Sequence, residues 1–281
     1  MKCDCGCEFT PEVVYDHRLI CGDCTDAAVV ARVMGDDVPN LILADPPYGV
    51  NIVATNGYVG GGEGPNGMIP FGGVKKAKRL GSVGGAKPFG DAPVRGSVGA
   101  SNIVDVGKYA PVIGDETTDT ALKASSFYLE MYPKAVHVWW GANYYVEGLG
   151  PSSCWLVWDK ETTGNFADCE LAWTNQDKAA KLFRHQWNGM LRDSERERRW
   201  HPTQKPAALA AWVFDEFTDS GAIILDPFAG AGWSVLGGES AGRKVRAIEM
   251  SEEYIGIILE RYMTATGKTP ELVSDAVLEG F

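Results

Sequence analysis

Leu41-Ile42-Leu43-Ala44-Asp45-Pro46-Pro47-Tyr48-Gly49 is the stretch on which the interpretation of the whole chain depends. Its four apolar residues, 41–44, predict a short buried strand. A carboxylate follows where the strand ends, and then come two prolines, which restrict the backbone, and an aromatic ring. The same pattern is typical of an ordinary Asp-Pro turn that ends a strand, so these residues alone leave both interpretations open.

The turn after this strand carries the groups needed to hold the exocyclic amino group of a nucleobase. That nitrogen is a poor nucleophile because its lone pair is conjugated with the ring. Asp45 and the carbonyl of Pro46 could accept its two hydrogens, and the prolines would keep both acceptors aimed. Tyr48 offers a face on which a base flipped out of a duplex can stack. The catalytic candidates are therefore Asp45, Pro46, Pro47 and Tyr48.

A second strand-and-turn unit lies in the last third of the chain. Residues 222–225 predict a strand, residues 226–232 a glycine turn that leads into a helix, and residues 244–248 a strand that ends at Glu249. Strand, glycine turn, helix, strand and acid form half of a doubly wound sheet with a nucleoside site at its crevice.

The glycine turn favours an adenosine cofactor without a pyrophosphate. Gly230 and Gly232 would let the backbone approach a ligand closely, and Glu249 could accept hydrogen bonds from a ribose diol. The third glycine of the dinucleotide fingerprint is absent, because Val235 stands there.

The rest of the patterned sequence alternates between strands and helices. Predicted strands cover residues 17–23, 135–140, 155–158 and 169–173, and predicted helices cover residues 25–34, 120–132, 206–218 and 251–266. Residues 175–200 are polar and carry charges of both signs, which predicts a solvated surface. Its arginines, among them Arg196, Arg198 and Arg199, could instead face a partner.

A glycine-rich stretch from Gly57 to Gly99 interrupts this alternation. Glycine occupies fourteen of its positions, and no helical or alternating period persists there, which predicts a long loop or insertion. It contains the densest basic run of the chain, formed by Lys75, Lys76, Lys78 and Arg79. A solvated loop is the plain interpretation. Because the stretch follows the Asp45 turn, it could also close over nucleic acid and contact phosphates.

Composition limits the classes of function. The net charge of −11 weighs against a protein that coats nucleic acid non-specifically, although local basic patches are still compatible with it. No apolar run reaches membrane-spanning length and the first residues lack a signal region, so we expect a cytoplasmic protein. Cys3, Cys5 and Cys7 alternate at the start, and Cys21 and Cys24 follow. These five cysteines could bind zinc, but alternating cysteines are not the usual paired spacing of zinc ligands, which favours free thiols and no metal.

Taken together, these motifs resemble the amino-methylating DNA methyltransferases of the permuted beta group, especially their phage-type and parB-associated members. Asp45–Tyr48 resembles their catalytic motif, Asp226–Gly232 their cofactor loop and Glu249 their ribose ligand. The segment 201–206, His-Pro-Thr-Gln-Lys-Pro, resembles the one that packs on the methionine moiety of the cofactor. The resemblance extends over roughly residues 13–265, apart from the glycine-rich stretch.

This resemblance implies a Rossmann-like, doubly wound mixed α/β sheet of the class I methyltransferase type, with circularly permuted motif order. It implies a single methyltransferase domain over residues 1–281, with an insertion at 57–114 and a short target-recognition segment at 160–200. The family's cofactor is S-adenosyl-L-methionine. The cofactor-binding residues that it implies are Asp23, Cys24, His201, Thr203, Lys205, Asp226, Pro227, Phe228, Ala229, Gly230, Gly232 and Glu249.

The implied activity is methyl transfer to the exocyclic amino group of adenine in DNA, by a site-specific, adenine-specific enzyme of restriction-modification type. Cytosine is the alternative base because its amino group presents the same geometry, and a catalytically idle nucleic-acid-binding protein is a further alternative. Thr203 and Lys205 would hold the carboxylate end of the cofactor. DNA is the expected partner, and a homodimer is compatible with the sequence. The DNA-binding candidates are Lys75, Lys76, Lys78, Arg79, Arg196, Arg198 and Arg199.

Overall fold

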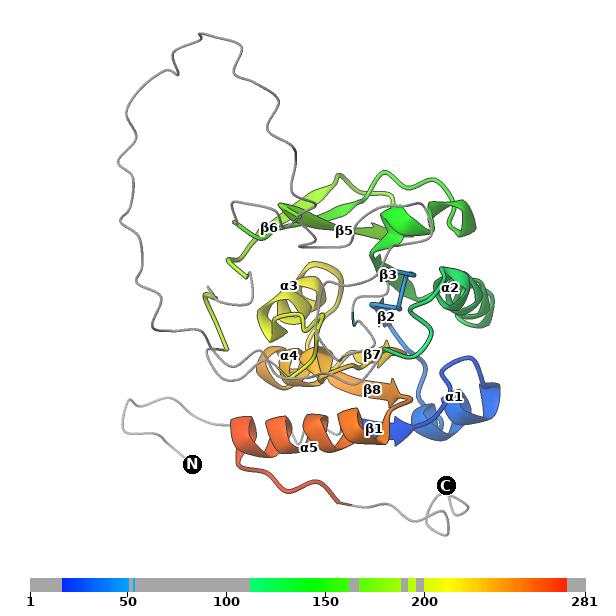
Figure 1. The fold of residues 1–281 in the computed structure, drawn as a ribbon. Coiled ribbons are helices and arrows are strands. Elements are labelled where there is room, and N and C mark those ends of the chain that lie inside the picture. The colour runs from blue at the N-terminus through cyan, green and yellow to red at the C-terminus, as the bar shows by residue number, and fades with distance from the viewer. Residues whose placement is uncertain are drawn as a thin grey trace, which may run out of the picture.

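The computed structural model describes residues 17–50, 53, 112–161, 167–187, 192–195 and 200–271. These residues build one eight-stranded sheet with the order β1-β8-β7-β2-β3-β5-β4-β6 (Figure 1). From β1 to β3 in this order all neighbours are parallel, whereas β5 runs antiparallel to β3 and β4. The strands are β1 (Arg18–Cys21), β2 (Leu41–Ala44), β3 (Val136–Trp140), β4 (Leu156–Asp159), β5 (Cys169–Thr174), β6 (Lys181–Arg184), β7 (Ile223–Asp226) and β8 (Lys244–Glu249).

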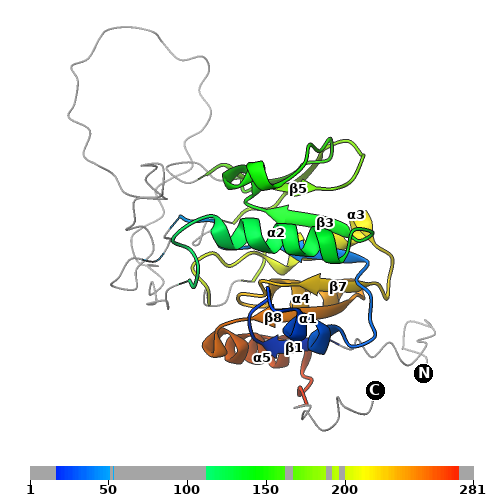
Figure 2. The same cartoon turned by 90° about the vertical axis from the view of Figure 1, so that its right-hand side faces the viewer.

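Helices cover both faces of the sheet. Figure 1 shows α1 and α2 on one face and α3 and α4 on the other, and Figure 2 looks onto the face that α1 and α2 cover. Their bounds are α1 (Ala27–Met34), α2 (Asp119–Met131), α3 (Ala207–Phe217), α4 (Trp233–Ala241) and α5 (Glu252–Thr266). Two short 3-10 helices follow β3, namely η1 (Ala142–Tyr144) and η2 (Val146–Gly148).

Strand β2 shows why the sheet is buried on both sides. Side chains alternate across a strand, so Leu41 and Leu43 pack in the core with α3 and α4, while Ile42 and Ala44 pack in the core with α1 and α2. All four are fully buried. A strand covered on both faces must be apolar throughout, which is the property that made residues 41–44 predictable.

Most predicted elements are confirmed to within two residues. The carboxylate of Asp26 accepts a hydrogen bond from the Ala28 amide and caps α1, and Gly35 ends this helix with φ of 57°. Ser251 caps α5 by accepting from the Tyr254 amide. Both helices therefore begin where the sequence predicted.

Residues 175–200, predicted as a solvated surface, contain a strand that the sequence did not predict. Lys181–Arg184 form β6, which pairs in parallel with β4 at the edge of the sheet. Leu182, within this strand, is 50% exposed. An edge strand with one solvated face is short and polar, and its stability comes from pairing rather than from an apolar sequence.

The chain reverses its direction of winding between β2 and β7. These strands are parallel neighbours, but the chain continues from β2 to β3 on one side and from β7 to β8 on the other. Loops that leave the carboxyl ends of two such strands diverge and leave a crevice between them. The predicted doubly wound mixed sheet is confirmed, and the turns after β2 and β7 meet at its switch point.

No helix within the described ranges is long and apolar enough to cross a membrane. Several predictions fall outside these ranges, including those for the basic run of the glycine-rich stretch and for the arginines at 196–199. Cys3, Cys5 and Cys7 lie outside them as well. Among the described residues, no group of three or more His, Cys, Asp or Glu side chains could hold a metal ion.

Candidate active site

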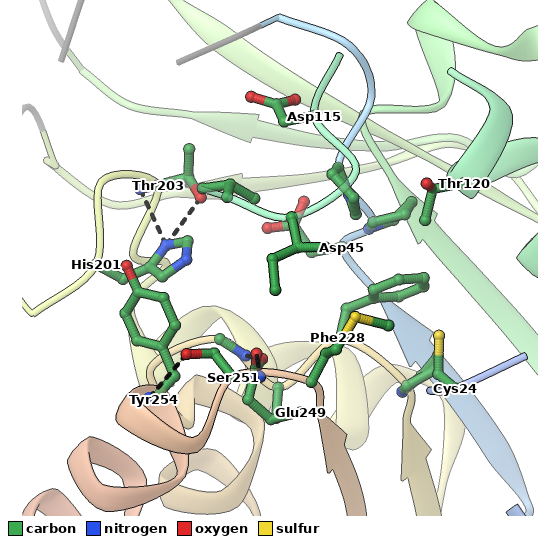
Figure 3. A pocket seen from close by; sticks show the side chains of 18 of the residues that line it. Cys24, Asp45, Asp115, Thr120, His201, Thr203, Phe228, Glu249, Ser251 and Tyr254 are labelled. Carbon is green, nitrogen blue, oxygen red and sulfur yellow. Dashed lines mark hydrogen bonds between the residues drawn. The ribbon is translucent and has the colours of Figure 1, made fainter. Parts of the chain in front are cut away.

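A cavity of about 300 Å³ lies at the carboxyl ends of β1, β2, β7 and β8. In Figure 3, Asp115 lies above the cavity and Glu249 and Ser251 below it, with Asp45 between them. The cavity brings together most of the predicted site residues: Asp23, Cys24, Asp45, Pro46, Pro47, Tyr48, His201, Thr203, Lys205, Pro227, Phe228, Ala229, Gly230 and Glu249.

Two predicted residues, Asp226 and Gly232, are not among those that line the cavity and instead support its floor. Asp226 is fully buried, and its carboxylate accepts a hydrogen bond of 2.9 Å from the Phe228 amide, which shapes the turn after β7. Burial raises the pKa of Asp226 to about 7. Gly232, in the left-handed region, directly precedes α4, and a Cβ atom added there would come within 3.0 Å of Ile258 of α5.

Asp115 holds the backbone of the catalytic turn. One oxygen of this buried carboxylate accepts hydrogen bonds from the amides of Gly49 and Val50, each at 3.1 Å. Asp115 precedes α2 and is far from the turn in sequence. The chain that leaves the turn therefore returns to it before α2 begins.

Tyr48 is held between a glycine and a second tyrosine. Its ring stacks on that of Tyr144 in η1, with ring centroids 4.7 Å apart and an interplanar angle of 8°. On another side it lies against Gly141, where a Cβ atom would come within 2.4 Å of the Tyr48 ring. A base that stacks on Tyr48 must therefore use the face that Tyr144 leaves free, or displace Tyr144.

Asp45 belongs to a buried cluster of four charges. The Lys205 ammonium forms ion pairs with Oδ2 of Asp45 and, at 3.2 Å, with Oε2 of Glu170 in β5. Lys160, which follows β4, pairs with the other oxygen of Glu170. The Oδ1 atom of Asp45 is buried and has no hydrogen-bond partner among the described residues. Lys205 thus contacts Asp45 and Glu170; the family resemblance predicts that it holds the cofactor's carboxylate.

The charged groups of this cluster shift one another's pKa values. Burial raises the pKa of Asp45; Lys205 opposes that rise and Glu170 adds to it. Burial alone would raise the pKa of Glu170, but Lys160 and Lys205 lower it to about 2. Desolvation would lower the pKa of Lys205, yet Asp45 and Glu170 together raise it above its ordinary value. The ammonium is therefore charged, and it is the group that favours the ionised form of Asp45 most strongly.

Glu249 at the end of β8 organises the other half of the cavity. Its two oxygens accept hydrogen bonds from the amides of Gly230, at 2.8 Å, and Ser251, at 2.9 Å. A carboxylate has about four acceptor sites, so Glu249 can accept further hydrogen bonds from a ligand. Gly230 adopts φ of 54°, and its Cα is open: a Cβ atom added there would come no closer than 4.0 Å to its nearest neighbour, the His201 ring.

His201 and Tyr254 form a wall beside this turn. Their ring centroids lie 4.5 Å apart. The Nδ1 atom of His201 accepts a hydrogen bond from the Thr203 amide at 3.2 Å, so the amide fixes the orientation of the ring (Figure 3). These rings and the backbone of the glycine turn form a cleft suited to an adenosine-like ligand.

Glu195 anchors the segment that carries His201 and Lys205. Its carboxylate accepts hydrogen bonds from the Ala207 amide at 2.5 Å and from the Gln204 side chain at 3.1 Å, and it pairs with Arg261 of α5 at 2.6 Å. Arg261 also donates to the carbonyl of Ala231 in the glycine turn. The segment and the turn are thereby fastened to the same helix.

Sequence reasoning missed several residues of the cavity, among them Thr120 and Lys123. A signal for these two was present, because a helix that crosses over between parallel strands begins at the carboxyl edge of the sheet. Asp115, Tyr144 and Glu170 carried no comparable signal, since their partners lie far away in sequence.

Comparisons with known proteins give matches over parts of the chain. Residues 140–260 match the N6_N4_Mtase family, described as DNA methylase. The chain is 39% identical over 71 residues to the DNA adenine methyltransferase YhdJ of Escherichia coli (strain K12), which is 25% of this chain and 24% of YhdJ. It is 33% identical over 84 residues to the type II methyltransferase M2.DpnII of Streptococcus pneumoniae, which is 29% of this chain and 31% of M2.DpnII.

These matches therefore span about a quarter to a third of the curated relatives. Among solved structures, the M1.HpyAVI–SAM complex aligns with 87% of this chain and 98% of its own, at 16% identity and a TM-score of 0.49. The family match includes Glu170, Lys205 and Glu249, whereas Asp45 lies before it. Residues 140–260 are thus similar in sequence to the DNA methylases.

Proposed function

We propose that this chain transfers a methyl group from S-adenosyl-L-methionine to the exocyclic amino group of adenine in DNA. The observation that carries the proposal is that one cavity joins an acceptor turn, with a buried and unpaired Oδ1 on Asp45, to a nucleoside-sized cleft at Glu249. The match of residues 140–260 to the DNA methylases and the names of YhdJ and M2.DpnII support it.

The residues around Glu249 fit S-adenosylmethionine. Glu249 would accept hydrogen bonds from the ribose hydroxyls, Asp23 would hold the adenine, and Phe228 would shape the pocket between them; all three line the cavity. The open backbone at Gly230 allows the ligand a close approach. When bound, S-adenosylmethionine supplies an electrophilic methyl group on a positively charged sulfur.

In this proposal, Asp45 binds the target amino group through its hydrogens. Oδ1 and the carbonyl of Pro46 accept the two amino hydrogens and direct the nitrogen lone pair toward the methyl group. As the nitrogen–carbon bond forms, the carbon–sulfur bond breaks and its electron pair stays on sulfur. The nitrogen then carries a positive charge and releases one proton, for which Asp45 is the nearest acceptor.

Adenine is preferred over cytosine because members of the resembled family that methylate cytosine more often have Ser where Asp45 stands. The permuted beta-group order and the phage-type subgroup remain part of this proposal, since the matches concern only the wider family. A homodimer draws no support from the comparisons.

The DNA-contacting segments also remain proposals. Val50 and Val112, on either side of the glycine-rich stretch, both line the cavity, which supports a role for this stretch near the target base. The segment 160–200 contributes β5 and β6 to the central sheet. If this segment recognises the DNA sequence, its loops would make the contacts.

The test is methyl transfer by the purified chain. Incubation with S-adenosylmethionine carrying a tritiated methyl group and with unmethylated DNA, followed by digestion to nucleosides, should yield labelled N6-methyladenine. Labelled N4-methylcytosine would support the alternative base. Asp45→Ala should lower kcat by orders of magnitude with little change in cofactor affinity, because the acceptor acts in the transition state. Cofactor binding in calorimetry without transfer to any DNA would favour an idle binding protein.

A further inference from the structure

We infer that Lys205 is a positioning residue for Asp45: its ammonium fixes Oδ2 and favours the ionised form of the carboxylate, so that Oδ1 is left for the amino group of the target base. The inference rests on the proposed function only in naming what Oδ1 accepts. It assigns Lys205 to the target nitrogen's side of the cavity instead of the cofactor's carboxylate.

The contacts of Lys205 support this assignment. The residue is only 3% exposed, and its ammonium contacts carboxylates from two different elements, Asp45 after β2 and Glu170 in β5. Glu170 is in turn held by Lys160, which follows β4, the strand beside β5. An ammonium with two carboxylate partners in a buried site is held in one place.

The cluster is balanced in charge, which explains how it is tolerated in the core. Two lysines face two carboxylates, and removal of one member would leave an uncompensated buried charge. The chain could have stabilised the same volume with apolar side chains. A buried ion cluster at this position is therefore better explained by what it does to Asp45 than by stability alone.

The two carboxylate oxygens of Asp45 have different surroundings. Oδ2 is occupied by the ammonium, whereas Oδ1 is buried without a partner in the described part of the chain. An unpaired buried carboxylate oxygen is costly unless a ligand satisfies it. A donor such as an amino N–H would satisfy it, and Lys205 prevents the carboxylate from turning.

Ionisation matters because a protonated Asp45 would present a donor where an acceptor is needed. The charged groups around it are Lys205, Glu170 and Lys160, together with Asp226 from β7, and the phenols of Tyr48 and Tyr145 also face it. Lys205 is the group among these that opposes protonation of Asp45 most strongly. Without Lys205, Asp45 would take up its proton at higher pH.

The experiment follows the Asp45 carboxyl directly. The full chain is labelled with 13C at aspartate carboxyls, the Asp45 signal is assigned with Asp45→Asn, and its titration is recorded in wild type and in Lys205→Met. We expect the midpoint to rise by about one pH unit or more in Lys205→Met. Lys160→Met should raise it less, because Lys160 influences the pKa of Asp45 less than Lys205 does. Lys181→Met, which removes a surface partner of Glu216, should not move it.

Kinetics and binding complete the test. In Lys205→Met the acid limb of the kcat profile should move up with the carboxyl titration, while the dissociation constant of S-adenosylmethionine stays within about twofold. If Lys205→Met does not fold, Glu170→Gln with Lys205→Met keeps the cluster neutral. The midpoint should still rise there, since Lys205 influences Asp45 more than Glu170 does.

An Asp45 titration midpoint that is unchanged in Lys205→Met, or in the double variant with Glu170→Gln, would overturn the inference. A large loss of cofactor affinity with an unchanged midpoint would likewise overturn it and make Lys205 a cofactor ligand. If the wild type methylates no DNA but the midpoint rises, the proposed function fails and the role of Lys205 stands.

Discussion

Replacing Gly141 by alanine tests how firmly the Tyr48 ring is held. Gly141 has φ of 69°, and a Cβ added there would lie 2.4 Å from Cε1 and 2.5 Å from Cδ1 of Tyr48. Ordinary contacts begin at 3.4 Å, so the ring must move by about 1 Å to make room. The left-handed backbone adds strain of about 1–2 kcal/mol for any residue with a Cβ atom.

Gly221 provides the matched control. It has φ of 81°, but a Cβ added there meets no atom within 4 Å. Gly221→Ala should therefore cost only the backbone strain, about 1–2 kcal/mol in the free energy of unfolding. Gly141→Ala should cost about 1–3 kcal/mol more, because it also overpacks the Tyr48 ring. The difference between the two variants isolates the contact with Tyr48.

The functional effect of Gly141→Ala should fall on turnover. Displacing a substrate-positioning ring by about 1 Å can reduce kcat about 100-fold. Affinity for S-adenosylmethionine should not change, because β7, β8 and the glycine turn build that side of the cavity. Urea denaturation, methyl-transfer kinetics and calorimetry measure the three quantities. Equal destabilisation of both variants, together with normal turnover of Gly141→Ala, would refute a fixed Tyr48 ring.

Three further changes probe the cofactor site, the charge cluster and the basic run. Glu249→Ala should weaken S-adenosylmethionine binding at least tenfold, since hydrogen bonds to a charged group contribute about 1.5–3 kcal/mol each. Calorimetry measures the dissociation constant, and an unchanged value would mean that Glu249 has a structural role only. Glu170 has a pKa depressed to about 2 from 4.5, so its ionised form stabilises the fold above pH 4.5 and that stabilisation is lost as the pH falls toward 2. Glu170→Gln should thus lower the free energy of unfolding by about 3 kcal/mol at pH 7 and by much less near pH 2, and a difference independent of pH in urea titrations would contradict this. Finally, alanines in place of the basic run should weaken DNA binding about equally across sequences and flatten the slope of log affinity against log salt, whereas parallel slopes would mean a solvated loop; the residues are Lys75, Lys76, Lys78 and Arg79.

The central strands could be predicted because burial on two faces leaves a local trace in the sequence. Residues 41–44 are apolar without interruption, and all four are fully buried. Strand β6 left no such trace. Lys181–Arg184 alternates exposed and half-buried residues, and its pairing with β4 is decided by a partner more than twenty residues earlier in the chain.

The same distinction separates the predicted site residues from the missed ones. Asp45 and Glu249 each stand at the carboxyl end of a predicted strand, so a short motif was enough to find them. Lys205 had a recognisable motif, but its contacts with Asp45 and Glu170 depend on how three separate elements pack. Tyr144 could not be predicted as the partner of Tyr48, because stacking depends on the turn at Gly141 after β3.

The bond between Asp115 and the turn after Tyr48 has a consequence for how this protein could be re-engineered. Because Asp115 binds the amides of Gly49 and Val50, the two ends of the connection between Val50 and Val112 are fastened to each other independently of what joins them. For a flexible connection, each doubling in length adds only about 0.6 kcal/mol to the entropy of closure. The connection can therefore be shortened, or exchanged for that of another protein, without displacing Asp45. If the proposed role of the glycine-rich stretch in DNA contact is right, grafting at Val50 and Val112 should change how the protein contacts DNA.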